Sequence, residues 1–169
     1  RRGITTMLPS DDGPWVAAEL ARRFTLPVWQ MAMTATDANR FVLRFARHLT
    51  GRPKVLVHDW CYHGTVDEAF ATLDDDGRVH PRPGSIGPAV DPALTTSVVQ
   101  INDLDATAAV LATGEVAAVL IEPAMTNVGI VLPDPGYHEA LRELCDRTGT
   151  LLVIDETHKL VTTPAYMFD

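Results

Sequence analysis

The sequence is poor in cysteine and lysine and has no long apolar run, and these shortages exclude several classes of protein. Its two cysteines, Cys61 and Cys145, suggest no disulfide framework, so we expect a reducing, cytoplasmic environment. No stretch approaches the roughly 20 apolar residues that a membrane-spanning helix needs. The first residues, Arg1-Arg2-Gly3, are not followed by the apolar run of a signal peptide, so none is expected.

The sequence also disfavours nucleic-acid binding and two common kinds of nucleotide site. The formal net charge of −8 argues against a nucleic-acid partner, because such partners are bound by basic patches. The sequence contains no G-x-x-x-x-G-K-[ST] motif for a nucleoside triphosphate and no G-x-G-x-x-G motif for a dinucleotide.

The chain has 169 residues, 46% of them hydrophobic, which is ordinary for one globular α/β domain.

Two apolar patterns alternate along the chain. Spacings of three and four residues predict helices over residues 14–24, 38–49, 104–111 and 137–145. Short apolar runs predict strands at residues 28–33, 55–57, 98–101, 116–121 and 151–154. Residues 74–96, rich in proline and glycine, are expected to form a long surface excursion. Buried strands separated by amphipathic helices predict an α/β fold, a mainly parallel sheet with helices on both faces.

In such a sheet a ligand lies beyond the carboxyl ends of the strands, so we expect the functional residues in four segments at predicted strand ends. The first is Met33-Thr34-Ala35-Thr36-Asp37, at the start of a predicted helix. Free backbone N–H groups and hydroxyls at a helix start suit a phosphate, although an ordinary N-cap explains the same residues.

The second and third segments follow the predicted strands at 55–57 and 116–121. In Cys61-Tyr62-His63-Gly64 the aromatic ring suits the face of a flat ligand, or simply packs. His58, Cys61 and His63 do not have the spacing of a zinc site, so no metal is expected. In the segment from Glu122 to Gly129, Asn127 can bond a ligand oxygen and Gly129 permits close backbone approach, but both are also common loop residues.

The fourth segment is Asp155-Glu156, directly after the last apolar strand. A carboxylate at the sheet edge requires a cationic partner, because an unpaired charge in a low-dielectric site is costly. A protonated pyridine nitrogen is such a partner, and an aspartate in that role recurs in sites for pyridoxal 5'-phosphate (PLP). Alternatively, these acids are magnesium ligands or ordinary surface residues.

The order of these motifs resembles that of class III PLP-dependent aminotransferases, in particular the branch that includes glutamate-1-semialdehyde aminomutase. Members of the family typically show N-S-G-T-E-A, T-G-R-x-K-I, Y-H-G, E-P with a following N-x-G, and D-E-V. In this chain the matching residues cover most of its length: Met33-Thr34-Ala35-Thr36-Asp37-Ala38, Thr50-Gly51-Arg52-Pro53-Lys54-Val55, Tyr62-His63-Gly64, Glu122-Pro123 with Asn127-Val128-Gly129, and Asp155-Glu156-Thr157.

The resemblance implies a partial PLP-binding large domain of fold type I over residues 1–169, without the family's small N- and C-terminal portions, in a cytoplasmic homodimer. It implies that Thr34, Ala35 and Thr36 hold the phosphate, and that Tyr62 and Thr157 lie against the two faces of the ring. It implies that His63 belongs to the same cofactor pocket. It further implies that Asn127 sits near the phenolic oxygen, and that Asp155 keeps the ring nitrogen protonated for catalysis.

The implied activity is amino-group transfer between an amino acid or amino aldehyde and a keto compound. The family's Schiff-base lysine lies a few dozen residues beyond D-E-V, and this chain has no matching lysine. Its only lysines are Lys54, at the wrong end of a strand, and Lys159, too close to Asp155. A chain that binds PLP without catalysis, or acts only as an interaction partner, is therefore the alternative hypothesis. A magnesium-dependent phosphate-handling enzyme that uses Asp155 and Glu156 is a third.

Overall fold

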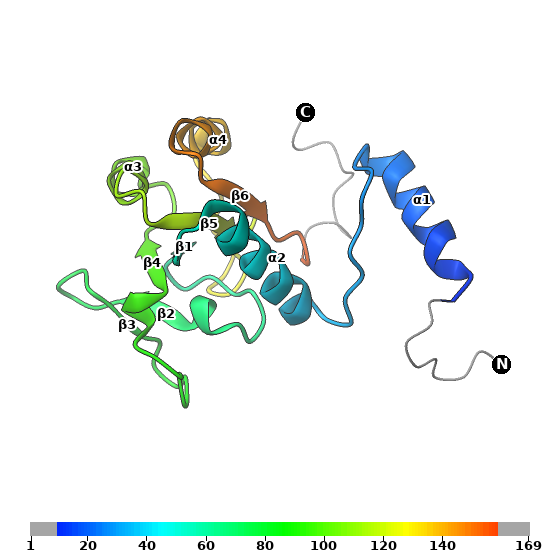
Figure 1. The fold of residues 1–169 in the computed structure, drawn as a ribbon. Coiled ribbons are helices and arrows are strands. Elements are labelled where there is room, and N and C mark those ends of the chain that lie inside the picture. Colours follow the sequence, from blue (N-terminus) through cyan, green and yellow to red (C-terminus); the bar gives the residue numbers. More distant parts are fainter. Residues whose placement is uncertain (1–9, 159–169) are drawn as a thin grey trace.

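A four-stranded parallel sheet forms the centre of the molecule in the computed structural model, which describes residues 10–158 (Figure 1). Its strands lie side by side in the order β4-β1-β5-β6, and every neighbouring pair is parallel. Their bounds are Lys54–His58 for β1, Thr96–Val99 for β4, Val116–Ile121 for β5 and Leu151–Ile154 for β6. The four strands predicted over these segments are confirmed, with boundaries that differ by at most two residues.

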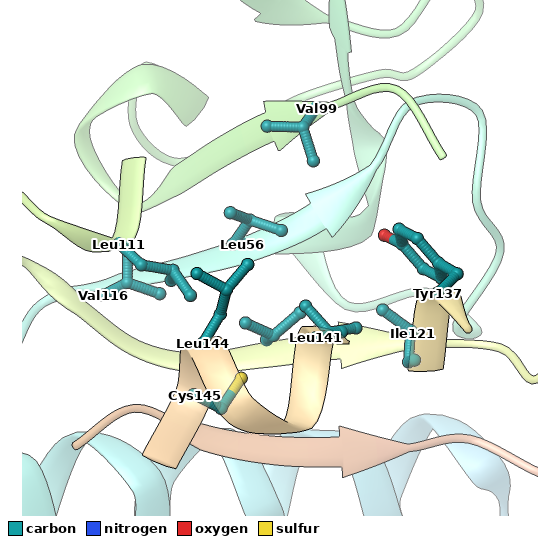
Figure 2. Packing of buried hydrophobic residues seen from close by; sticks show 10 residues of the cluster. Leu56, Val99, Leu111, Val116, Ile121, Tyr137, Leu141, Leu144 and Cys145 are labelled. Atoms are coloured by element: carbon teal, nitrogen blue, oxygen red, sulfur yellow. The ribbon is translucent and has the colours of Figure 1, made fainter. Parts of the chain in front are cut away.

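Helices cover both faces of this sheet, as predicted. One face carries α3, Leu104–Leu111, and α4, Tyr137–Thr148, whose apolar side chains meet those of the strands in a dry cluster (Figure 2). Alternate strand residues point to that face, as the two-residue period of a strand requires. The buried members of the cluster are Leu56, Val99, Leu111, Val116, Val119, Ile121, Tyr137, Leu141, Leu144 and Cys145.

The opposite face is covered by α2, Ala35–Thr50. Leu43 and Ala46, three residues apart on one side of this helix, are almost fully buried against the strand residues of the opposite parity, Val55, Val57 and Leu120 among them. The helix begins with its N-cap at residue 34 and ends at residue 51, a glycine in the left-handed conformation. The helix predicted over these residues is confirmed, but Phe45 and Leu49, which belong to the apolar pattern that predicted it, lie on its exposed side.

The N-terminal helix α1, Asp12–Phe24, is confirmed, but it buries none of its residues and lies apart from the sheet (Figure 1). The strand predicted over residues 28–33 is wrong. These residues form no sheet ladder, and Val28 and Met33 are 85% and 93% exposed. A strand requires a hydrogen-bonding neighbour as well as an apolar run, and none of the strands between residues 10 and 158 pairs with this segment.

The predicted surface excursion contains more regular structure than expected. Two short strands, β2 (Ala71–Leu73) and β3 (Val79–Pro81), pair antiparallel, flanked by the 3₁₀ helices η1 (Asp67–Phe70) and η2 (Pro92–Leu94). The turn between the strands is held by Asp74, whose Oδ1 accepts from the backbone N–H groups of residues 76 and 78. The sequence D-D-D-G was a turn signal of this kind. Within residues 10–158, no helix is both long and apolar enough to cross a membrane.

Candidate functional site

A cavity of about 130 Å³ lies where the carboxyl ends of β1, β5 and β6 meet the start of α2. This is the edge of the sheet at which parallel α/β folds bind ligands. Residues from four separate segments of the chain line the cavity: Ala35, Thr36, Tyr62, Gly64, Glu122, Asp155, Thr157 and His158.

The carboxylate of Asp155 is held from several sides. Its backbone N–H continues the sheet by donating to the carbonyl of Ile121 at 2.8 Å. Its Oδ2 accepts from Asn39 Nδ2 at 2.8 Å and faces His63 Nδ1 at 3.0 Å. Its Oδ1 accepts from the backbone N–H of Thr157 at 3.0 Å and from the hydroxyl of the same residue. The orientation of this acid is therefore fixed by α2, by the loop after β1 and by its own turn.

These contacts favour the charged form of both partners of the His63–Asp155 pair. Burial alone would raise the pKa of Asp155, but hydrogen bonds from His63, Thr157 and Asn39 outweigh it and hold that pKa well below the usual range. Burial alone would lower the pKa of His63, but its hydrogen bonds to Asp155 and Cys61 raise it to about 9. The cavity wall thus carries a carboxylate that stays ionised at neutral pH.

The start of α2 forms the opposite wall. Thr34 is its N-cap: the hydroxyl of this residue accepts from the backbone N–H of Asp37 at 3.1 Å and donates to the carboxylate of Asp37 at 2.9 Å. The hydroxyl of Thr36 accepts from the backbone N–H of Thr65 at 3.0 Å, which leaves its own O–H free to donate. Thr34 therefore uses its hydroxyl for the cap, while Ala35 and Thr36 face the cavity.

The loop after β1 approaches this helix start closely at Gly64. The residue has φ of +75°, and a Cβ built on it would lie 2.2 Å from Thr36 Oγ1. Only glycine satisfies both requirements without strain. The resemblance includes a glycine at this place, and the geometry supplies its physical reason.

Tyr62 and Asn127 come from the two loops that close the remaining sides. The phenol ring of Tyr62 is 40% exposed and lines the cavity, and its backbone N–H lies 3.3 Å from Glu122 Oε1. Asn127 does not line the cavity; its side chain donates to the carbonyl of Trp60 at 3.1 Å. The loop that follows β5 is thereby fastened to the loop that follows β1.

The structure therefore brings Ala35, Thr36, Tyr62, Asp155 and Thr157 around one cavity and places the other three predicted site residues near it. His63 is fully buried behind the carboxylate rather than in the cavity wall, and Thr34 and Asn127 do not line the cavity.

Asn39, Glu122 and His158 were not predicted as site residues. Asn39 follows the expected phosphate segment at one turn of helix from Ala35, so helical periodicity was the available signal. Glu122 was quoted in a motif without a role. His158 had no signal in the sequence beyond its nearness to Asp155.

Lys54, the one lysine among the residues that the structure describes, does not line the cavity. Lys54 begins β1 at the far end of the sheet, where its ammonium group lies 3.1 Å from Glu115 Oε2. This placement agrees with the sequence prediction. Lys159 lies outside the described residues.

Comparison with known proteins places this geometry in a family. The family model described as "Aminotransferase class-III" matches residues 13–159. The chain belongs to the class III aminotransferase family. The glutamate-1-semialdehyde 2,1-aminomutase of Opitutus terrae is 38% identical over 143 residues, a match that covers 82% of this class III chain and 34% of the relative.

Solved structures agree with the assignment. A glutamate-1-semialdehyde-aminomutase from Pseudomonas aeruginosa shares 57% identity with a TM-score of 0.90 over 94% of this chain and 35% of that protein. An omega-transaminase from Sphaerobacter thermophilus shares 29% identity with a TM-score of 0.78 over 94% of this chain and 38% of that protein. The class III chain thus spans about a third of the length of these relatives, and its fold is that of their PLP-dependent, fold type I class. A variant of the Pseudomonas protein was crystallised in complex with PMP.

Proposed function

We propose that the protein containing this chain is a PLP-dependent aminotransferase or aminomutase, which moves an amino group between an amino acid or amino aldehyde and a keto compound. The chain supplies the cofactor pocket apart from the Schiff-base lysine. One observation carries the proposal: the ionised carboxylate of Asp155 faces a cavity whose opposite wall is the start of α2. Family membership and the PMP complex of a variant of the Pseudomonas relative support it.

The residues around the cavity fit this cofactor on their own chemistry. PLP has a pyridine nitrogen that becomes cationic on protonation and a phosphate dianion at the other end of the molecule. Asp155 provides the anion for the nitrogen, and the N–H groups at the start of α2 provide donors for the phosphate. The hydroxyl of Thr36, already accepting from Thr65, adds a further donor for the phosphate. The cationic nitrogen of the cofactor thus has an anionic partner, and its phosphate has hydrogen-bond donors.

When bound, PLP supplies an electron-accepting ring for the carbanion formed at the substrate's α-carbon. The chain's own residues keep that ring charged and in place. Asp155 would hold a proton on the ring nitrogen, while His63 and Asn39 prevent the carboxylate from turning away. Tyr62 and Thr157 would lie against the two ring faces, and Asn127 is proposed to lie near the phenolic oxygen.

The amine-exchange and proton-transfer steps at the α-carbon require a lysine that is neither Lys54 nor, by its spacing, Lys159. The position of Lys54 at the far end of β1 favours one alternative for this chain: reversible PLP binding without catalysis. Borohydride distinguishes the two, because it fixes PLP covalently only where a lysine of the protein is bonded to the cofactor.

The experiment is a titration of the full-length protein with PLP, monitored by its visible absorbance, followed by addition of an amino donor. We expect an absorption band of bound PLP that shifts with the donor, and loss of binding in Asp155→Ala. The matched control is Asp105→Ala, because Asp105 lies on α3, on the far face of the sheet. A protein that binds no PLP would refute the proposal, and a bound band that no donor shifts would favour the alternative.

We further propose that the protein works as a cytoplasmic homodimer. Support comes from apolar side chains exposed on the outer side of α2 and on the segment before it, namely Phe41, Phe45, Leu49, Val28, Met31 and Met33. A second copy of the chain would cover such a surface. The two cysteines are free, as expected of a reducing compartment.

A further inference from the structure

Three side chains beside the cavity form a connected hydrogen-bonded group. Thr126 Oγ1 donates to Glu122 Oε2 at 2.7 Å, and the same hydroxyl lies 2.8 Å from His158 Nδ1. His158 Nδ1 is also 3.8 Å from Glu122 Oε2. We refer to these residues as the Glu122–Thr126–His158 group. Glu122 and His158 both line the cavity that Asp155 faces.

The direction of the hydrogen bonds fixes the form of the imidazole. The hydroxyl of Thr126 has a single proton, and a carboxylate can only accept, so that proton goes to Glu122. The oxygen of Thr126 therefore accepts from His158, which carries its proton on Nδ1. In the neutral ring the other nitrogen, Nε2, is then an unprotonated base. A proton exchanged with a ligand must pass through this atom.

Burial of the acid completes the arrangement. The side chain of Glu122 is only 4% exposed, whereas that of His158 is 49% exposed. A buried carboxylate held beside a ring that reaches solvent and cavity orients the ring and balances a positive charge on it. Catalytic bases are commonly supported in this way, with the base held by a third group.

We propose that His158 is a further catalytic residue of the cavity, which takes a proton at Nε2 from the ammonium group of the amino substrate. This inference rests on the proposed function. An N–H bond of the ammonium group breaks, the Nε2–H bond forms, and the electron pair stays on nitrogen, which becomes a nucleophilic amine. Glu122 balances the charge of the imidazolium through Thr126, and the imidazolium then releases the proton to solvent, which the 49% exposed ring reaches. A substrate amine enters as a cation at neutral pH, so a base is required before it can react.

The competing explanation is that His158 only fastens the turn after β6 to the loop after β5. The first test needs no bound cofactor: nitrogen NMR of the full-length protein labelled at histidine. We expect the His158 ring as the Nδ1–H tautomer in the wild type and in Thr126→Ser. Thr126→Val should lose this preference, because valine has the shape of threonine without the hydroxyl. An Nε2–H tautomer in the wild type would overturn the proposal.

The second test is kinetic and uses a single half-reaction with an amino donor. Replacement His158→Ala should lower its rate by about a hundredfold, and added imidazole should restore part of the loss. PLP affinity should not change. His48→Gln, an exposed histidine of α2, is the matched control and should react like the wild type. A loss that imidazole does not restore would leave His158 a structural residue and refute the inference. If the wild type binds no PLP, the proposed function itself fails, so the two failures are distinguishable.

Discussion

Asn39 Nδ2, on the first turns of α2, donates to Asp155 Oδ2 at 2.8 Å across 116 positions of sequence. The same amide group donates to the backbone carbonyl of His63 at 3.1 Å. One buried side chain thus joins the helix start, the loop after β1 and the turn after β6. The three walls of the cavity are positioned relative to one another by this contact.

Replacement of Asn39 by alanine should therefore lower the free energy of unfolding and also weaken the binding of PLP. The carbonyl of His63 would be left buried with one partner fewer, which costs about 1–3 kcal/mol. Urea denaturation should show this loss, and the dissociation constant for PLP should rise. Arg40→Ala, at the next and exposed position of α2, is the control and should leave both quantities nearly unchanged. Equal effects of the two replacements would contradict the role given to Asn39.

The His63–Asp155 pair predicts a limited pH range of full stability. The folded-state pKa of His63 is about 9, against roughly 6.5 unfolded, so its contribution is complete below about pH 6.5 and is lost as pH rises through 9. The folded-state pKa of Asp155 is depressed, so its contribution is present above roughly pH 4 and is lost on further acidification. Stabilisation by the pair should be greatest between about pH 4 and 6.5.

Melting temperatures of the full-length protein between pH 5 and 9.5 would measure this dependence. In His63→Gln the alkaline decline due to this pair should disappear, and the melting temperature at pH 6 should fall by several degrees. An exposed histidine serves as control, and His48→Gln should retain the wild-type curve. An unchanged alkaline decline in His63→Gln would show that His63 does not titrate as inferred.

Gly64→Ala should disrupt the phosphate end of the site. The new methyl group would meet the hydroxyl of Thr36 at 2.2 Å, in a backbone conformation that alanine adopts only under strain. We expect PLP affinity to fall at least about tenfold, because displacement of Thr36 disturbs the helix start. Gly77→Ala is the matched control: it has the same φ of +75° and nothing within 4 Å. If both variants bind PLP equally, backbone strain rather than the contact with Thr36 explains any effect on stability.

Most of the sheet and its helices could be predicted because they bury a periodic set of side chains. The periodic pattern identified α2 as a helix, but of its larger side chains Phe45 and Leu49 are exposed, and Leu43, which was not part of the pattern, packs against the sheet beside Ala46. Residues 28–33 were predicted wrongly as a strand because apolar character alone does not supply a pairing partner. The β2–β3 hairpin was missed because its strands are only three residues long each.

The site itself could be predicted only in part. Asp155 was predicted as a site residue because it is an acid directly after an apolar strand, and Tyr62 because an aromatic stood at a neighbouring strand end. The order of the motifs along the chain indicated the family. The support of Asp155 by Asn39 depends on how α2 turns over the sheet, which a local pattern does not encode. The same is true of the contact between His158 and Thr126, since 32 positions separate them.

The proposed homodimer gives a prediction on the outer side of α2. Phe45→Glu places a charge among apolar side chains, so we expect the full-length protein to sediment as a monomer with reduced PLP affinity. Ala112→Glu, exposed beside the helices of the other face, is the control and should sediment like the wild type. A Phe45→Glu protein with the sedimentation of the wild type would exclude this surface from the dimer contact.

The loops on either side of the cavity are tied to one another at two points, by Asn127 to the carbonyl of Trp60 and by Glu122 to the backbone N–H of Tyr62. The backbone that carries Tyr62 therefore cannot shift alone, because the segment beyond β5 is bonded to it. Under the proposed function, accommodation of a bulkier amine by a shift of this backbone would accordingly require changes on both loops at once.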